Sequence, residues 1–151
     1  DVEIANNYGI SLLYICAKGT EGGDILTDQP ERTGAFDEYT RGEIRNYHLS
    51  YHRYFPNGEH NPGVNIRKNP GFHRVAHHEP DPCIQPGEYH IALRKEGPRI
   101  RFWVNDSLIH DWTDKERYGP VLQSGKIGFR NRGKPGVYKV YYDNVRVYRL
   151  P

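Results

Sequence analysis

The sequence lacks several features that would assign its class directly. Its 151 residues contain no methionine, only two cysteines, and no apolar run approaching the roughly 18 residues that can cross a membrane. Cys16 and Cys83 are too few and too far apart for a disulfide framework or a zinc site. The formal net charge of +2 carries no signature of nucleic-acid binding. We therefore expect no membrane span and no nucleic-acid partner.

The chain also lacks the common local motifs of catalysis. It has no serine nucleophile elbow, phosphate-binding loop, dinucleotide fingerprint or paired zinc-ligand motif. It begins at Asp1, so we expect a processed product or a piece of a longer polypeptide. With so few cysteines, cytoplasm, periplasm and secretion remain open alternatives for its compartment.

The residues that are present favour β-structure throughout. Tyr, Val and Ile are frequent, Gly and Pro punctuate often, and amphipathic helical periods are nearly absent. Many strands with closely spaced turn signals predict an all-β sandwich of two antiparallel sheets. The predicted strands are Ile10–Ala17, Ile44–Tyr54, Gly63–Lys68, Phe72–His78, Glu88–Lys95, Arg99–Asn105, Leu108–Trp112, Lys126–Arg132 and Val137–Tyr148.

Two neighbouring predicted strands carry polar side chains at every second position. Side chains alternate between the faces of a strand, so Asn46, His48 and Ser50 share one face of the first strand. His52 continues this face by the same alternation, and Asn65 and Arg67 form its counterpart on the next strand. Such a face is either solvated or a platform for a polar ligand such as a sugar. We favour the platform, because amide, imidazole, hydroxyl and guanidinium groups gather there.

A long irregular segment, Lys18–Gly42, precedes these strands. Loops of this length in a small domain are usually functional or disordered, and its aromatic residues argue against disorder. We predict a lid over the polar face that brings Asp24, Arg32, Tyr39 and Glu43 toward a ligand. The alternative is ordinary loop geometry, permitted by the glycines around Asp24.

Two further residues, His73 and Trp103, are candidates for the site and also have structural interpretations. His73 lies near the start of its strand and is a second candidate base, whereas Trp103 shares a polar face with arginines and can stack on a sugar ring. Packing beneath a loop is the alternative for Trp103. The histidine spacings do not predict a metal site, and we expect no cofactor.

The C-terminal motifs resemble a known fold, and other motifs resemble one family within it. Gly125–Arg130 and Tyr142–Val147 are similar to the closing strands of concanavalin A-like jelly rolls. A second set of motifs covers most of the chain: Ala17-Lys18-Gly19, Gly23-Asp24-Ile25, Arg32-Thr33-Gly34, Gly42-Glu43-Ile44, His48-Leu49-Ser50-Tyr51, Asn65-Ile66-Arg67-Lys68, Gly71-Phe72-His73 and Tyr118-Gly119-Pro120-Val121. Together these motifs resemble the bacterial YesU-like family, which has a galectin-like sandwich.

The resemblance implies an all-β concanavalin A-like jelly roll, with residues 1–151 forming a single domain. The same fold analogy gives a structural calcium ion near Asp143 as the alternative to no cofactor. The resemblance also implies that this domain matches the C-terminal two-thirds of the family domain. Either another chain or an N-terminal segment completes the sandwich, or the fold has lost strands and exposes an open apolar edge. We expect some of Ile10, Leu12, Tyr14, Ile84, Ile100 and Phe102 to border that edge.

The same resemblance implies a role in breaking down acidic, rhamnose-containing polysaccharides. We therefore expect a lyase that acts on a uronate by β-elimination. Arg67 with Asn65 would neutralise the carboxylate, His48 or His73 would act as base, and Tyr39 as acid. The substrate contacts would come from Asn46, Ser50, Asn65, Asp24, Arg32, Glu43 and Trp103. The alternative is a carbohydrate-binding module without turnover, which needs the same polar face but no proton transfer.

Overall fold

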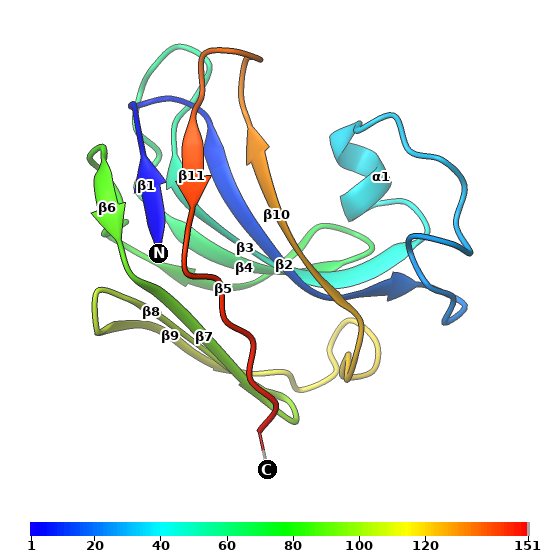
Figure 1. The fold of residues 1–151 in the computed structure, drawn as a ribbon. Coiled ribbons are helices and arrows are strands. Elements are labelled where there is room, and N and C mark those ends of the chain that lie inside the picture. The colour runs from blue at the N-terminus through cyan, green and yellow to red at the C-terminus, as the bar shows by residue number, and fades with distance from the viewer. Residues whose placement is uncertain (151) are drawn as a thin grey trace.

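Three antiparallel sheets account for nearly all of the regular structure. The computed structural model describes residues 1–150, and Figure 1 shows its sheets as a layered β-structure. The largest sheet has the strand order β10-β2-β3-β4-β5. Its strands are β10 (Lys126–Arg132), β2 (Ile10–Gly19), β3 (Ile44–Arg53), β4 (Val64–Asn69) and β5 (His73–His78).

Two smaller sheets pack on one face of the five-stranded sheet. One has the order β11-β1-β6, with β11 (Val140–Tyr142), β1 (Val2–Ile4) and β6 (Gly87–Tyr89). The other has the order β7-β8-β9, with β7 (Ile91–Glu96), β8 (Arg99–Val104) and β9 (Ser107–Thr113). The short helix α1 (Phe36–Thr40) lies on the opposite face of the large sheet (Figure 1). The expected all-β jelly roll is confirmed.

The strand predictions need two corrections at the points where the chain changes sheet. The predicted strand Glu88–Lys95 is two strands, because β6 pairs with β1 whereas β7 pairs with β8. His90 separates them, and its backbone N–H donates to Asn105 Oδ1 at 2.8 Å. The predicted last strand, Val137–Tyr148, is strand only over Val140–Tyr142, where β1 is available as a partner.

The core lies between the large sheet and the two small sheets. Leu49 and Ile66 from the large sheet are fully buried in one cluster with Ile100 and Phe102 of β8. Burying an aliphatic or aromatic side chain of this size contributes about 1.5–3 kcal/mol each. Since side chains alternate, burial of Leu49 turns its neighbour His48 to the opposite face of the sheet.

A buried ion pair attaches the segment between β9 and β10 to the core face of the sheet. Lys68 Nζ donates to Asp114 Oδ2 at 2.7 Å and to the Gly119 carbonyl at 2.6 Å. Tyr47 also donates to Asp114 Oδ2 and accepts from the Leu122 N–H at 3.1 Å. Burial opposes ionisation of Asp114, but these hydrogen bonds outweigh it and hold the pKa of the carboxyl below its usual value.

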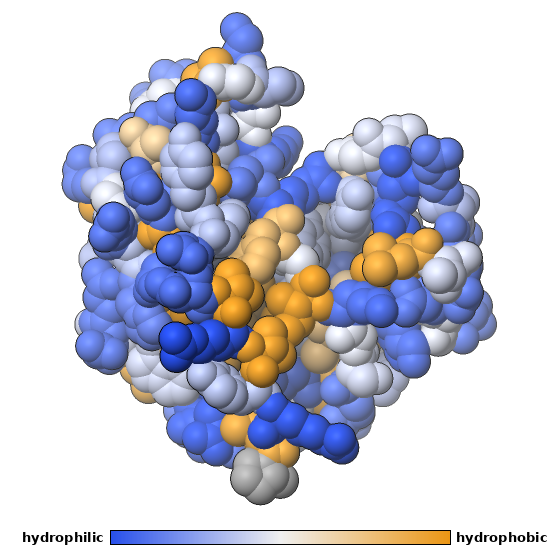
Figure 2. Space-filling model, in the orientation of Figure 1, coloured by the Kyte–Doolittle hydropathy of each residue, from blue (hydrophilic) through white to orange (hydrophobic). Residues whose placement is uncertain are grey.

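An apolar patch lies where β10 forms the edge of the large sheet. Ile127 and Phe129 of β10 are 48% and 44% exposed, and Val145 and Val147 of the C-terminal segment are more exposed still. Figure 2 shows apolar colour where β10 and that segment lie in Figure 1. Within residues 1–150, β10 pairs only with β2.

The exposed residues differ from most of those expected at an open edge. Leu12, Tyr14, Ile100 and Phe102 are buried in the described structure, so these four are not exposed at an open edge. Of the residues expected to border an open edge, Ile84 is exposed. The two small sheets cover the centre of the large sheet, whereas on β10 the Phe129 ring is covered only in part, by Tyr142 of β11.

We predict that replacing Asp114 with alanine lowers the free energy of unfolding by about 3–5 kcal/mol, because it leaves the buried Lys68 ammonium without its counter-ion. Chemical denaturation measures the change. The matched control is Asp111→Ala, which removes the exposed ion pair to Arg99 on β8 and should cost only a small fraction of that loss. Equal losses in the two variants would contradict the role given to the buried pair.

Candidate functional site

The polar face predicted for β3 and β4 exists, and the strand register aligns its members. Asn46, His48 and Ser50 of β3 lie opposite Asn69, Arg67 and Asn65 of β4. The intervening residues, Tyr47, Leu49 and Ile66, are fully buried in the core as the alternation requires. The predicted register is therefore confirmed.

The segment Lys18–Gly42 packs on this face as predicted, but it covers the face more completely than a lid over a solvated platform would. The Asn46 side-chain amide donates to the Tyr39 carbonyl at 2.9 Å, and Asn46 is fully buried. Phe36 of α1 lies edge-on to His48, with 6.3 Å between ring centroids. Arg130 of β10 donates to the Gly34 carbonyl at 2.6 Å and so holds the segment down.

A cleft of about 540 Å³ remains beside α1. Figure 2 shows the molecule hollowed between α1 and the loops at the other end of the large sheet. Polar and aromatic side chains line the cleft together with glycines, and the described lining contains no carboxylate. The lining residues are Tyr8, Gly9, Ile10, Leu12, Phe36, His48, Ser50, Arg53, Tyr54, Phe55, Pro56, Asn61, Arg67, Phe72, Arg132, Gly133 and Lys134.

Four cationic side chains line this cleft without a counter-ion. None of Arg53, Arg67, Arg132 and Lys134 forms an ion pair with a carboxylate in the described part of the chain. Burial, together with repulsion from Arg53 and Arg74, lowers the pKa of Arg67 to about 10. An anion in the cleft would offset the cost of burial and the repulsion between the arginines, because it would supply the negative charge that the lining residues lack.

Arg67 is held in place by backbone and aromatic contacts. One guanidinium nitrogen, Nη1, donates to the Phe72 carbonyl at 2.7 Å. The guanidinium also lies over the Phe72 ring, with 3.8 Å between Cζ and the ring centroid. These contacts fix the orientation of the group and leave its charge available to a ligand.

His48 lies beside Arg67 and is neutral in the folded protein. Only 1% of its surface is exposed, and its Nδ1 faces the Asn69 side-chain nitrogen at 2.9 Å. Burial lowers the pKa of His48 to about 3, and the charges of Arg67 and Arg53 add to this effect.

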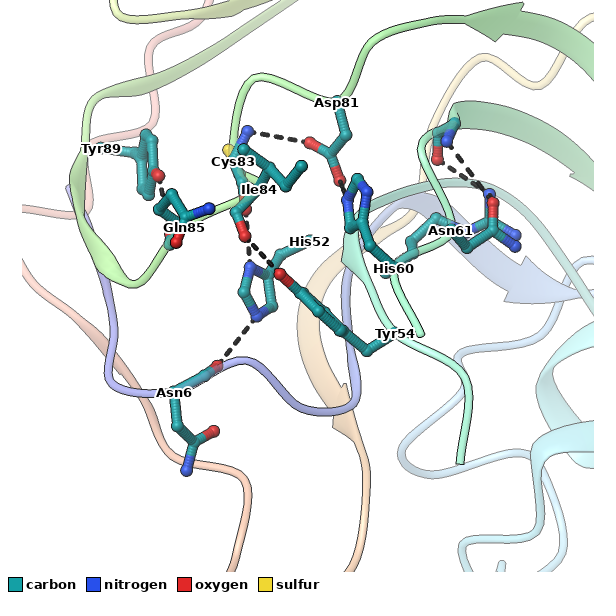
Figure 3. A network of polar contacts seen from close by, with 12 residues as sticks. Asn6, His52, Tyr54, His60, Asn61, Asp81, Cys83, Ile84, Gln85 and Tyr89 are labelled. Carbon is teal, nitrogen blue, oxygen red and sulfur yellow. Dashed lines mark hydrogen bonds and ion pairs between the residues drawn. The ribbon is translucent and has the colours of Figure 1, made fainter. Parts of the chain in front are cut away.

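His52 does not belong to the polar face, contrary to the prediction. Its backbone has φ = +44°, and the pairing of β2 with β3 shifts between Ser11↔Tyr51 and Ile10↔Arg53. This irregularity ends the alternation. Figure 3 shows the His52 ring between two carbonyl groups, those of Cys83 at 2.6 Å and Asn6 at 3.0 Å.

The same irregularity explains why alternation along the sequence does not place Arg53 in the site. Strict alternation from Asn46 puts Arg53 on the core face, whereas the extra residue turns it into the cleft. Its Nη1 donates to Asn61 Oδ1 at 2.9 Å and to the Gly63 carbonyl at 2.8 Å. The basic turn at Arg132 and Lys134 was the one signal in the sequence that could have indicated the other wall.

Polar contacts behind the cleft support the wall that Tyr54 and Asn61 form. Figure 3 shows the Tyr54 hydroxyl donating to the Ile84 carbonyl, at 2.5 Å. His60 faces the buried Asp81, with 3.9 Å between Nε2 and Oδ2, and burial raises the pKa of Asp81. The Cys83 N–H donates to the other Asp81 oxygen at 2.9 Å. This network anchors the loop after β3 to the segment that precedes β6.

Several predicted site residues lie away from the cleft. His73 stacks on Tyr118 with 3.9 Å between centroids, on the Lys68 side of the sheet, because the pairing of β4 with β5 shifts after Ile66. Trp103 belongs to β8 in a different sheet and contacts Arg101. These two residues are therefore not brought to the candidate site.

Of the four residues predicted from the segment Lys18–Gly42 and its return to β3, two lie behind the cleft lining and two lie away from it. Asp24 pairs with Lys126 at 2.9 Å beside a separate hollow, and Glu43 is exposed on the chain that returns to β3. Arg32 lies over the Tyr39 ring at 5.7 Å, and Tyr39 contacts Tyr14, which in turn contacts His48. Arg32 and Tyr39 thus lie behind the cleft lining, and Asp24 and Glu43 are remote from it. Asn65 bonds to His77 Nδ1 at 2.8 Å instead of lining the cleft.

The described residues contain no group of three or more His, Cys, Asp and Glu side chains placed to hold a metal ion. Asp143 Oδ1 accepts a hydrogen bond from the Asn144 N–H at 2.7 Å. None of the helices over residues 1–150 is long and apolar enough to cross a bilayer.

The sheets and the cleft define a galectin-like all-β protein. A solved structure of a protein of unknown function with a galectin-like fold from Bacillus subtilis matches with a TM-score of 0.81 and 33% identity, covering 93% of this chain and 65% of that one. The uncharacterized protein YesU of Bacillus subtilis (strain 168) is 36% identical over 129 residues, which are 81% of this chain and 58% of YesU.

Residues 1–147 match the family described as a domain of unknown function (DUF1961), and the chain belongs to that family. The chain spans less than two-thirds of the length of each of these two relatives. The YesU-like resemblance is confirmed, and the galectin-like fold is one compatible with carbohydrate binding.

We predict that His48→Gln weakens the pH dependence of stability. The unfolded chain takes up a proton on His48 near pH 6.5, whereas the folded protein does so only at about pH 3. The wild type therefore loses stability as the pH falls below about 6.5, by at most about 1.4 kcal/mol per pH unit from this residue. Urea denaturation at pH 6 and pH 5 should show a smaller loss in the variant. An unchanged loss would show that His48 already binds its proton in the folded state.

Proposed function

We propose that this protein binds an acidic oligosaccharide in the cleft beside α1. The observation that carries the proposal is the set of four cationic side chains, Arg53, Arg67, Arg132 and Lys134, that line the cleft with no carboxylate among its described lining residues. Arg53 and Arg67 are partly buried, whereas Arg132 and Lys134 are exposed at the wall of the cleft. Partly buried cations without counter-ions cost free energy in the free protein, and an anionic ligand would offset that cost. A polar ligand also needs uncharged partners, and His48, Ser50 and Asn61 line the same cleft.

The shape of the cleft supports an oligosaccharide as the anion. Its volume of about 540 Å³ lies within the range of small-molecule binding sites. Phe36, Phe55 and Phe72 supply apolar faces against which sugar rings can pack, while hydroxyl and amide groups between them can bond to sugar hydroxyls. The galectin-like fold agrees with this class of ligand.

Lyase-type β-elimination on a uronate is the second candidate, and the adjacency of Arg67 and the neutral His48 favours it. Arg67 would neutralise the carboxylate, a base would remove the adjacent carbon-bound proton, and its electrons would form the double bond as the glycosidic oxygen leaves with a proton from an acid. The Nδ1 lone pair of His48 already accepts from Asn69, and His73 does not line the cleft. Binding is therefore better supported than elimination.

We predict that Arg67→Gln weakens the binding of oligogalacturonate by about tenfold or more, because hydrogen bonds to a charged group contribute roughly 1.5–3 kcal/mol. Isothermal titration calorimetry at fixed salt measures the change. Arg99→Gln, at an exposed arginine of β8 outside the cleft, is the matched control and should bind like the wild type. Equal affinity of the wild type for a neutral oligosaccharide of the same length would contradict the proposal.

A separate assay distinguishes binding from turnover. Prolonged incubation with oligogalacturonate should give a complex without the ultraviolet absorbance of an unsaturated uronate. If that absorbance rises and Arg67→Gln abolishes the rise, the protein is a lyase and the binding-only function is wrong.

A further inference from the structure

We infer that a buried chain of amide hydrogen bonds makes His48 a hydrogen-bond donor to the cleft, and that His48 and Arg67 together bind the carboxylate of a uronate. This inference rests on the proposed function. The inference adds two things to that function: the anionic group that is recognised, and the assignment of Asn46 and Asn69 as positioning residues.

The chain of hydrogen bonds starts at a group that can only accept. The Tyr39 backbone carbonyl lies 2.9 Å from the Asn46 side chain, so the Asn46 atom that faces it must be the amide nitrogen. The Asn46 oxygen then faces the Asn69 side chain at 2.7 Å and must accept from the Asn69 amide nitrogen. The Tyr39 carbonyl therefore orients both amides, independently of His48.

The last step sets the tautomer of His48. The Asn69 amide nitrogen carries two hydrogens, and one is used on Asn46. The same nitrogen lies 2.9 Å from His48 Nδ1, so the second hydrogen points at that ring nitrogen. His48 Nδ1 must therefore be the acceptor, and the proton of the neutral ring is on Nε2. No described protein group accepts from Nε2, and His48 lines the cleft.

Arg67 presents the complementary part of the site. Its Nη1 is used on the Phe72 carbonyl, whereas Nε and Nη2 have no hydrogen-bond partner among the described residues and are not buried. These two nitrogens form one edge of the guanidinium, and their parallel N–H groups match the two oxygens of a carboxylate. Arg53 differs, because its Nε is buried and unpartnered.

The register places the two donors side by side. His48 and Arg67 are directly opposed on neighbouring strands, and cross-strand partners of this kind have Cβ atoms about 4.5–5.5 Å apart. A planar carboxylate can accept from the Arg67 edge and from His48 Nε2–H together. A tetrahedral sulfate ester of equal charge matches the parallel N–H pair less well, so the site should distinguish uronates from sulfated sugars. His48 in this tautomer is a donor, and it does not supply the base of an elimination.

The tautomer is tested directly by nitrogen-15 NMR of the histidine rings in the wild-type protein, with His48→Gln used to assign the signal. We expect the His48 signal of a neutral ring protonated on Nε2 throughout pH 5–7, a range above the pKa of about 3. Asn69→Leu, which removes the donor to Nδ1, should reduce this tautomeric preference. A ring protonated on Nδ1 in the wild type would overturn the inference even if oligosaccharides bind.

The ligand chemistry is tested by calorimetry with oligogalacturonate and with a sulfated oligosaccharide of the same length and charge. We expect the wild type to bind the uronate about tenfold more tightly, and we expect Arg67→Lys to lose most of this preference because a lysine lacks the paired N–H edge. Equal binding of both ligands by the wild type would overturn the carboxylate assignment and leave the proposed function intact. Binding of neither ligand would overturn the proposed function as well.

Discussion

One buried ion pair joins the core face of the large sheet to the segment between β9 and β10. Lys68 and Asp114 meet on the core face of the large sheet, and Tyr47 joins them through the same carboxylate oxygen. The pair fixes the segment that leads from β9 to β10, and β10 leads to the turn that carries Arg132 and Lys134. A contact on one side of the sheet therefore helps to position a wall of the cleft on the other side. Either charge alone in this environment would be strongly destabilising, so the two must be retained together.

The two faces of β3 and β4 differ in whether their cationic side chains have a counter-ion. On the core face, Lys68 has its counter-ion, whereas on the cleft face Arg67 has none and lies near Arg53. Unpaired charge of this kind reduces stability, and proteins tolerate it where a ligand supplies the missing partner. The aromatic ring of Phe72 and the backbone carbonyl beneath it hold the guanidinium in the free protein without neutralising it.

Local alternation predicts the central part of the candidate site well. It places His48, Ser50 and Arg67 on one face, and all three line the cleft. The prediction fails at His52 and His73 for the same physical reason, an irregularity in strand pairing: His52 is the extra residue of β3, and His73 is separated by such an irregularity from His77 on the polar face. A single extra residue transfers the side chains on one side of it to the opposite face. Such irregularities depend on the neighbouring strand, so alternation within one strand does not reveal them.

Patterns within the sequence are enough to predict the all-β class, most of the strands and the polar face of β3 and β4, because residue type and period along one strand decide which side faces the core. The family is indicated by the resemblance of its motifs. Three features follow only from the folded structure: the lid buries Asn46, Arg53 and Arg132 line one cleft with Arg67, and His48 is a donor. Those outcomes depend on which atoms meet across strands far apart in the sequence, and the direction of a hydrogen bond is settled only when all of its neighbours are in place.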